Sequence, residues 1–458
     1  MTKPVLEPEF KPAIIELRNF FADVGKYQNR QHLIVSIERA NGYIYRKEFD
    51  ILPEGIDDER NSFIVEGIIK SILWVVGGYK IFIAGSHAVY LSIKKQYSVD
   101  GQRDFDYHFM STVFEKKMEV IECSYKDIPH MKTSSLSVGG HLKGRRIGFD
   151  VGGSDIKVSA VKDGKVLSSE EIVWLPKLNE DINYHYGFFY KAMKRAIGKL
   201  GGDVDAIGIS AAGVIVENKP MVSSIFIKVP KENFELVKGA YINTVRRLEK
   251  ELGHKIPFEV ANDGDVTALA GALDIKDNCV LGIAMGTSEA VGYVDKNGNL
   301  PGWFSELAFM PIDFNKNAMV DEWSHDYGVG CKYFSQDAVI KLAPKASITL
   351  DEKLTLAEKL KVVQKLNEEG HEGAKQIFES IGVYLAYALA YYAEFYEIKH
   401  VLLLGRVTSG KGGETILKVA KETILKEFPE YNNIEIGMPS DFMRRLGQSI
   451  AAASLPKI

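Results

Sequence analysis

The fold of this chain is decided by the stretch Ile147-Gly148-Phe149-Asp150-Val151-Gly152-Gly153-Ser154-Asp155-Ile156-Lys157-Val158-Ser159-Ala160-Val161. An apolar run ends in an aspartate, a Gly-Gly-Ser turn follows, and a second strand then alternates apolar and polar residues. Glycines let a backbone turn tightly and come close to a bound anion. Ser154 offers a hydroxyl to a phosphate, and Asp150 is placed to hold a metal-bound water. The pattern predicts a phosphate-binding hairpin, although an ordinary hairpin has the same form.

The composition limits the classes of protein to consider. A length of 458 residues suggests roughly two or three domains, and 46% hydrophobic with 26% charged residues is typical of a globular protein. A net charge of −4 gives no electrostatic case for a nucleic-acid partner. The three cysteines include no CxxC pair, which argues against a thiolate zinc cluster or a disulfide framework. Without a signal-peptide core or an apolar run of spanning length, we expect a cytoplasmic protein without membrane contact.

A boundary is expected near residues 133–146, where Ser, Gly and basic residues read as a linker. The preceding residues, 1–144, should form an N-terminal α/β module with a hairpin at 33–45, a helix at 61–74 and a buried strand at 80–86. Two roles stay open for this module: a degenerate half-repeat of the C-terminal core, or a capping or dimerising domain. The early hairpin and the lack of a basic helix disfavour a winged-helix DNA reader.

The remaining residues alternate strand and helix signals, which predicts an α/β fold. Strands are expected at 206–210, 258–260, 279–284 and 400–404. Helices are expected at 241–252, 264–273 and 372–396.

The pair Asn262-Asp263 stands where a predicted strand ends and a helix begins. In α/β proteins, ligands bind in the crevice at such strand ends. Phosphorylation of a hydroxyl needs a carboxylate that accepts its proton, a role that Asp263 can fill, and Asn262 can fix a sugar by donating and accepting hydrogen bonds. Both residues are also common helix caps, so capping is the alternative interpretation.

Three further turns are rich in glycine or hydroxyl residues. They are Gly208-Ile209-Ser210-Ala211-Ala212-Gly213, Gly286-Thr287-Ser288 and Leu404-Gly405-Arg406-Val407-Thr408-Ser409-Gly410-Lys411-Gly412-Gly413. The second has the form of another phosphate loop, and the third, a strand followed by a Gly-rich turn, could pack against an adenine-ribose unit. Plain turns or surface loops remain the alternative for each.

In this order, the segments resemble the ROK family (repressors, open reading frames, kinases), the sugar kinases of the hexokinase-type, actin-like ATPase superfamily. The resemblance covers residues 145–458. It implies a two-lobed actin-like ATPase (ribonuclease H-like) core, with lobe one at about 145–262 plus the C-terminal helix and lobe two at about 263–435. It also implies ATP and Mg²⁺ as cofactors, a small-molecule sugar substrate and a possible homodimer.

The resemblance implies roles for individual residues. Asp263 would be the catalytic base, and the sugar would be bound by Asn262, Glu306 and Gly213. ATP and its metal would be bound by three groups: Asp150, Gly152, Gly153, Ser154 and Lys157; Gly286, Thr287 and Ser288; and Gly405, Arg406 and Gly410. Asp150 would hold Mg²⁺ through water.

The sequence departs from the family pattern at several places. Where the family carries Glu-x-Gly-His, Glu306 remains but Phe309 replaces the histidine, and of the zinc-binding cysteines only Cys331 is left, so no structural zinc is expected. A further sugar-binding carboxylate is not visible, and His325 could serve instead or lie at the surface. Glu289 follows the second loop, where a charged carboxylate would repel phosphates. Arg406 replaces a glycine and could stack on adenine, pair with a phosphate or block the site.

The sequence therefore predicts ATP-dependent phosphorylation of a sugar or sugar-derivative hydroxyl, a phosphotransferase of carbohydrate metabolism. The alternative is a catalytically silent sugar- or nucleotide-binding or regulatory protein on the same scaffold. A DNA-binding repressor is a third and weaker option, since the N-terminal module lacks a helix-turn-helix signal.

Overall fold

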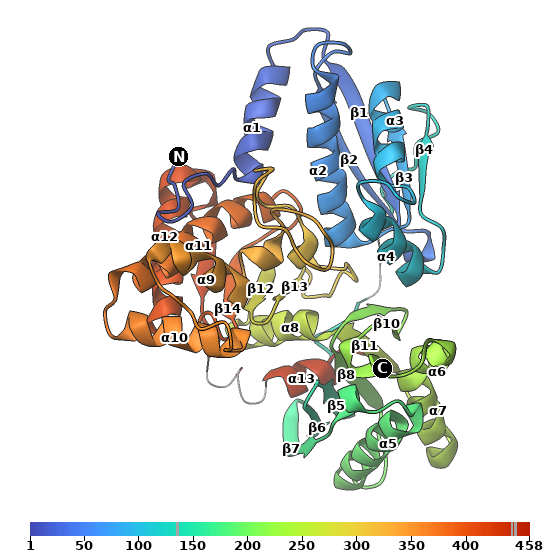
Figure 1. Ribbon diagram of the computed structural model, residues 1–458. Coiled ribbons are helices and arrows are strands. Elements are labelled where there is room, and N and C mark those ends of the chain that lie inside the picture. The colour runs from blue at the N-terminus through green and yellow to red at the C-terminus, as the bar shows by residue number, and fades with distance from the viewer. Residues whose placement is uncertain (134–136, 441–442, 444–446) are drawn as a thin grey trace. The chain divides into compact units, whose positions relative to one another are not determined.

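The computed structural model describes residues 1–133, 137–440, 443 and 447–458 (Figure 1). The chain divides into two units. Unit 1 comprises Met1–Ser134, Ile283–Val291 and Gly302–Gly437, and unit 2 comprises Ser135–Gly282, Gly292–Pro301 and Met438–Ile458. Each unit is described by itself.

Unit 2 is built on a five-stranded sheet with the strand order β11-β8-β5-β6-β7. Its strands are β5 (Arg145–Val151), β6 (Asp155–Lys162), β7 (Lys165–Val173), β8 (Ala206–Ala211) and β11 (Phe258–Asn262). β5, β6 and β7 are antiparallel neighbours, whereas β8 runs parallel to β5 and β11 parallel to β8. The carboxyl ends of β5, β8 and β11 therefore meet at one edge, where ligands bind in α/β sheets.

Helices and a small hairpin surround this sheet. They are α5 (Ile182–Lys199), α6 (Phe234–Lys238), α7 (Ala240–Leu252), α8 (Asp263–Ile275) and α13 (Gln448–Ala453), with the hairpin β9 (Val214–Val216) and β10 (Lys219–Val222). α13 lies directly on the sheet, because a Cβ at Gly148 would stand 1.9 Å from the Ser449 carbonyl oxygen and one at Gly208 would stand 1.6 Å from that of Ala452. Only glycine allows this approach.

Unit 1 begins with a four-stranded sheet of order β2-β1-β3-β4. Its elements are β1 (Gln31–Glu38), β2 (Ile44–Ile51), β3 (Lys80–Ala84) and β4 (Glu119–Glu122), with α1 (Ala13–Val24), α2 (Asp58–Val76), α3 (His87–Gln96) and α4 (Asp104–Phe114). β1 pairs antiparallel with both β2 and β3, and β3 runs parallel to β4. In unit 2, the strands β5 and β8 are parallel.

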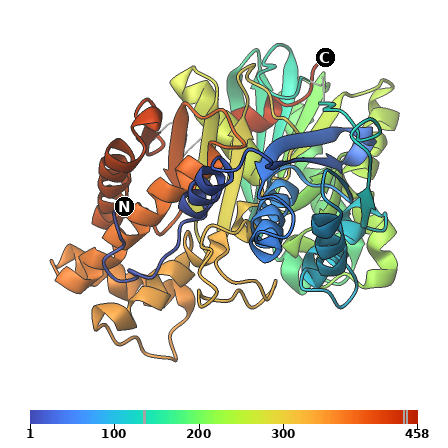
Figure 2. The same cartoon turned by 90° about the horizontal axis from the view of Figure 1, so that it is seen from above.

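The C-terminal part of unit 1 holds a second sheet of order β13-β12-β14-β15 and the helices beside it. The elements are β12 (Val280–Met285), β13 (Glu289–Val294), β14 (His400–Leu404), β15 (Glu435–Gly437), α9 (Gln336–Leu342), α10 (Leu356–Glu368), α11 (Glu372–Tyr392) and α12 (Gly410–Glu427). The unit division of the chain falls within β12 and β13. α11 is buried along most of its length and packs beside α12 (Figure 2).

The mixed α/β class and the expected helices and strands are confirmed, with ends that differ by a few residues. One difference concerns the predicted Gly-rich turn after β14. α12 already begins at Gly410, so Gly410, Lys411, Gly412 and Gly413 are helical, and only residues 405–409 form the turn. A Cβ at Gly412 would stand 2.7 Å from the Phe378 ring, so close helix packing explains that glycine. Part of the predicted linker, residues 134–136, lies outside the described residues.

None of the helices in the described part of the chain is both long and apolar enough to cross a membrane.

Candidate functional site

Asp150 lies at the carboxyl edge of the unit 2 sheet. It stands opposite Ser210 on β8, and the Ser210 hydroxyl donates a hydrogen bond of 2.7 Å to Asp150 Oδ1. Burial raises the pKa of Asp150, while the bond from Ser210 and the charge of Lys157 act against that rise. Lys157 is opposite Asp150 on β6, is partly exposed and lies 3.6 Å from Asp155. Asp150 is therefore fixed through one oxygen next to a cation.

The turn after Asp150 is closed by bonds that the sequence did not suggest. The Gly152 amide donates to the Asp155 carbonyl at 3.0 Å. The Trp174 indole donates to the Gly152 carbonyl at 2.9 Å, and the Trp174 amide donates to the Ser154 carbonyl at 3.2 Å. Trp174 is buried, whereas Gly153 and Ser154 are exposed. Trp174 thus holds the backbone of the loop, while the tip at Gly153 and Ser154 stays accessible to an anion.

Asn262 ends β11 and caps α8. Its Oδ1 accepts a 2.7 Å bond from the Gly264 amide, and its Nδ2 donates a 2.8 Å bond to the Gly213 carbonyl. Gly213 has a φ of 107°, and a Cβ there would stand 2.0 Å from the Val222 carbonyl oxygen. The capping alternative is therefore correct for Asn262. Because an amide has two N–H donors and two acceptor lone pairs, these bonds use half of its capacity.

Asp263 begins α8 and lies beside Asp150. Burial, and secondly the charge of Asp150, raise the pKa of Asp263 to about 6. Its Oδ1 also accepts a 3.0 Å bond from the Gly264 amide. A carboxylate with a pKa near the working pH is well suited to accept a proton from a hydroxyl.

The Tyr241 hydroxyl belongs to the same buried site in unit 2. Burial, followed by the charges of Asp263 and Asp150, raises the pKa of this phenol. The hydroxyl oxygen has no hydrogen-bond partner among the described residues. Sequence reasoning missed Tyr241 because it lies within α7, where a tyrosine reads as part of the apolar face.

The second glycine-hydroxyl turn joins β12 to β13. The Gly286 amide donates to the Ser288 carbonyl at 3.0 Å, and the Gly286 carbonyl accepts a 2.9 Å bond from the Gln336 amide. Thr287 and Ser288 are exposed at its tip. The turn therefore exposes two hydroxyl side chains, those of Thr287 and Ser288.

Glu289 does not point to this tip. It is buried, and Tyr392 donates a 3.2 Å hydrogen bond to its Oε1. Its Oε2 has no hydrogen-bond partner among the described residues. Burial raises the pKa of Glu289 to about 8, and the charge of Glu306 adds to that rise. Glu289 is therefore directed away from the exposed tip, and its buried site favours the protonated form of the carboxyl over a charge that would repel phosphates.

The turn after β14 lies against the end of β12, immediately before Gly286. Gly405 has a φ of 92°, and a Cβ there would stand 2.3 Å from the Met285 carbonyl oxygen. The Val407 amide donates to the same carbonyl at 3.1 Å. Arg406 is exposed on this turn, and its carbonyl accepts a 2.7 Å bond from Gln364. Unit 1 thus brings the second loop and the predicted adenosine turn together.

Glu306 is held through its backbone. Its amide donates to the Trp74 carbonyl at 2.9 Å, and the Ser305 amide donates to the Val75 carbonyl at 2.9 Å. His325, the residue considered as a substitute sugar ligand, is exposed. The two carbonyls come from the N-terminal part of unit 1, and no sequence signal connects them with Glu306.

The predicted residues therefore fall into two sets. Unit 2 contains Asp150, Gly152, Gly153, Ser154, Lys157, Gly213, Asn262 and Asp263. Unit 1 contains Gly286, Thr287, Ser288, Glu306, Gly405, Arg406 and Gly410.

Comparison with known proteins gives a fold but no close relative. No family model matches the sequence, and no curated protein matches it. Among solved structures, the ROK hexokinase of Thermus thermophilus is 16% identical, with a TM-score of 0.52 over 68% of this chain and 97% of that protein. A ROK family transcriptional regulator, a homologue of the E. coli MLC protein, is 15% identical, with a TM-score of 0.50 over 69% of this chain and 78% of that protein. A ROK family glucokinase from Streptomyces griseus, solved with glucose and AMPPNP, is 18% identical, with a TM-score of 0.47 over 68% and 99%.

Proposed function

We propose that this chain, which has the actin-like ATPase fold of ROK proteins, transfers a phosphoryl group from ATP to a hydroxyl of a sugar or sugar derivative. The observation that carries the proposal is the pair of half-buried carboxylates in unit 2, Asp150 and Asp263. Asp263 has a pKa of about 6, and Asp150 lies beside it at the carboxyl edge of the sheet. Two carboxylates close together repel each other unless a proton or a cation lies near them.

In this proposal, Asp263 accepts the proton of the sugar hydroxyl as its oxygen attacks the γ-phosphorus, and ADP leaves with the bridging oxygen. The carboxylate and the hydroxyl would need to stand within hydrogen-bond distance. Asn262 would orient the sugar with the second N–H donor and the second acceptor lone pair of its amide, which its bonds to Gly213 and Gly264 do not use. Glu306 and the Gly213 turn would complete the sugar contacts.

The donor set of Asp150 fits a hydrated magnesium ion. Mg²⁺ prefers one or two carboxylates and keeps several waters. The Ser210 hydroxyl donates a hydrogen bond to Asp150 Oδ1 and thereby fixes the orientation of the whole carboxylate, including Oδ2. Bound Mg²⁺ would neutralise charge on the ATP phosphates. The phosphates would be contacted by Gly152, Gly153, Ser154 and Lys157 and by Gly286, Thr287 and Ser288, and the adenosine by Gly405, Arg406 and Gly410.

A second candidate is a silent sugar- or nucleotide-binding regulator on the same scaffold. The observation that favours it is the second loop, where Ser288 stands in place of the glycine that is usual after the threonine and is followed by the buried Glu289. In that case ligands bind but no phosphate is transferred.

The test is a phosphotransfer assay with ATP–Mg²⁺ and a panel of D-glucose, D-mannose, N-acetylglucosamine and N-acetylmannosamine, combined with calorimetry for binding. The kinase proposal expects ADP formation with at least one sugar and a loss of about 10²- to 10⁴-fold in turnover for Asp263→Asn, with sugar binding retained. Binding without any turnover would support the silent candidate. Absence of binding of both ATP–Mg²⁺ and sugar would refute both.

A further inference from the structure

The segment that carries Glu306 depends on other parts of unit 1 for its position. This segment, residues 302–337 and here called the Glu306 segment, contains the short helices η5 (Leu307–Phe309) and η6 (Gly330–Lys332) and the first residues of α9. Most of its backbone groups therefore need partners outside regular structure. Many of these partners lie within the segment itself, and backbone hydrogen bonds join it to the first 110 residues at Lys11, Ala13, Trp74 and Val75.

The end of α2 provides the first set of partners. The last carbonyls of a helix have no intrahelical donor. Here the Trp74 and Val75 carbonyls accept from the Glu306 and Ser305 amides at 2.9 Å each. The buried Arg39 donates to the Val76 carbonyl at 2.7 Å and also to the Gly302 carbonyl. The C-terminus of α2 is thus capped by the segment that carries Glu306.

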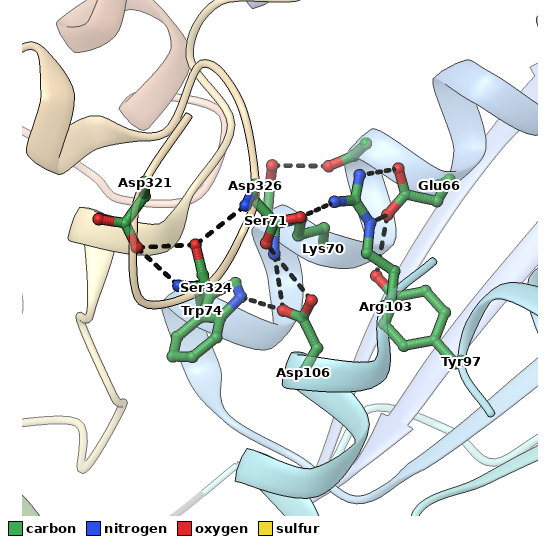
Figure 3. A network of polar contacts seen from close by, with 11 residues as sticks. Glu66, Lys70, Ser71, Trp74, Tyr97, Arg103, Asp106, Asp321, Ser324 and Asp326 are labelled. Atoms are coloured by element: carbon green, nitrogen blue, oxygen red, sulfur yellow. Dashed lines mark hydrogen bonds and ion pairs between the residues drawn. The ribbon is translucent and has the colours of Figure 1, made fainter. Parts of the chain in front are cut away.

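A buried cluster of charged side chains provides the second set (Figure 3). Lys70 of α2 donates to both oxygens of Asp106 of α4, at 2.7 and 2.9 Å. Arg103, the residue before α4, donates two parallel bonds of 2.6 and 2.7 Å to Glu66. All four side chains are at most 8% exposed. Two cations and two carboxylates balance each other within this N-terminal cluster.

Asp326 of the Glu306 segment enters this cluster as a third carboxylate. Its Oδ2 accepts a 2.7 Å bond from Lys70, and its Oδ1 accepts a bond from Arg103. The segment forms a tight turn behind it, since the Asp321 amide donates to the Asp326 carbonyl at 2.8 Å. One side chain therefore joins the segment to both buried cations.

Trp74 connects the cluster with Glu306. Its indole donates a hydrogen bond to Asp106, while its carbonyl accepts from the Glu306 amide. Its ring also packs against Phe309, with ring centroids 4.5 Å apart. A displacement of the segment from the cluster would therefore disturb the Trp74 contacts with Glu306 itself and with Phe309, three residues further along the chain.

We propose that Asp326 is a positioning residue for Glu306: by bonding Lys70 and Arg103, it fastens the Glu306 segment to the N-terminal part of unit 1 and fixes the carboxylate that contacts the sugar. The contact of Glu306 with sugar rests on the proposed function, whereas the fastening does not. The N-terminal residues then serve as a permanent internal support for the substrate segment.

Loss of Asp326 differs from loss of its partners. Without it, Lys70 keeps Asp106 and Arg103 keeps Glu66, so no buried cation loses its last partner. Asp326→Asn and Asp326→Ala should therefore fold and release the segment. Glu430→Gln is the matched control, because it removes a carboxylate from an exposed ion pair with Arg18 in the same unit.

The experiment measures hydrogen exchange of peptides that contain residues 303–309, together with steady-state kinetics on the full chain. We expect exchange at Ser305 and Glu306 to rise about tenfold in Asp326→Ala and less in Asp326→Asn, while exchange in β5 of unit 2 stays unchanged. The KM for sugar should rise about tenfold, with kcat and the KM for ATP within about twofold of wild type, since tenfold corresponds to losing about one hydrogen bond to a charged group. Glu430→Gln should change none of these values.

Unchanged exchange at residues 303–309 in both Asp326 variants would overturn the proposal, and so would faster exchange with an unchanged KM for sugar. If the wild-type protein transfers phosphate to no sugar, the proposed function fails, and the exchange data still decide whether Asp326 holds the Glu306 segment.

Discussion

Two groups of carboxylates, one in each unit, have opposite surroundings: Asp150 and Asp263 in unit 2 are half-buried, whereas those of unit 1 are buried among cations. In unit 2, the charge of Asp150 adds to the effect of burial on Asp263 and raises the pKa of Asp263 to about 6. In unit 1, three carboxylates (Glu66, Asp106 and Asp326) are bonded to Lys70 and Arg103. Burial of a carboxylate is costly, and pairing with a cation offsets part of that cost and holds the carboxylate in place as part of the scaffold. The comparison separates a group arranged for chemistry from a group arranged for position.

The largest expected effect concerns the pH dependence of unit 2. The folded pKa of Asp263, about 6, lies above its ordinary value of 3.8, so the folded state binds more protons between these values. Stability should therefore fall as pH rises from about 4 to about 6, while turnover, which needs the deprotonated base, should rise through about pH 6. Asp263→Asn should lose about 10²- to 10⁴-fold in turnover and lose this part of the pH dependence of stability. Urea unfolding and initial rates measured from pH 4.5 to 8 check both trends.

A rate that is flat across pH 6 in the wild-type protein, with Asp263→Asn equally active, would remove the distinction between the two groups. It would mean that Asp263, like the carboxylates of unit 1, has a structural role.

The next effect is expected in the ion cluster of unit 1. Lys70→Met would keep the length of the side chain but leave three buried carboxylates with one cation, Arg103. Removal of one partner from a buried pair costs about 3–5 kcal/mol. We expect this loss in the free energy of unfolding at pH 7, measured by urea denaturation. Asp326→Asn leaves each cation a carboxylate partner, so its loss of unfolding free energy should be clearly smaller. Equal losses in the two variants would show that Lys70 and Arg103 need the charge of Asp326 as well.

Sequence reasoning predicted the class of the fold and the residues at strand ends, because apolar periodicity and glycine-hydroxyl turns are local signals. Asp150, Asn262 and Asp263 follow from such signals, and the structure places them at one edge of one sheet. Ser210 was quoted only as part of a turn, although its bond to Asp150 sets the orientation of that carboxylate. A contact between two strands 60 residues apart leaves no mark in a single sequence.

The support of Glu306 was not predicted for a related reason. Its anchors, the carbonyls of Trp74 and Val75, are backbone groups that every residue carries, so no residue type indicates them. Glu66 and Lys70 read as polar positions of the predicted helix at 61–74. Arg103, Asp106 and Asp326 lie outside the helices and strands that the sequence predicted. Glu289 follows an exposed turn in the sequence, which suggested a place near the phosphates, whereas in the structure its side chain is buried at the start of β13.

A third prediction concerns Glu289, a carboxylate in unit 1 outside the ion cluster. Its pKa, like that of Asp263, is raised mainly by burial. Its folded pKa of about 8 exceeds the ordinary 4.5, so its buried site favours the protonated form. Stability should fall as pH rises from about 5 through about 8, and Glu289→Gln, which stays neutral, should lack this fall. The free energy of unfolding at pH 7 and pH 9 checks this, with the exposed Glu352→Gln as control. An equal fall in Glu289→Gln and wild type would contradict the protonated assignment.

The smallest expected effect compares two buried tyrosine hydroxyls, one in each unit. The Tyr391 hydroxyl in unit 1 shares a 2.7 Å hydrogen bond with Ser71, whereas the Tyr241 hydroxyl in unit 2 has no partner among the described residues. Tyr391→Phe should lose about 1 kcal/mol of unfolding free energy, because it leaves the Ser71 hydroxyl with one bond fewer. Tyr241→Phe should be neutral or more stable by about 1 kcal/mol, because it removes a buried polar group that makes no bond. A loss in Tyr241→Phe as large as that in Tyr391→Phe would mean that the Tyr241 hydroxyl is bonded in solution, and the buried site around Asp150 and Asp263 would then hold an ordered water or ion in the absence of substrate.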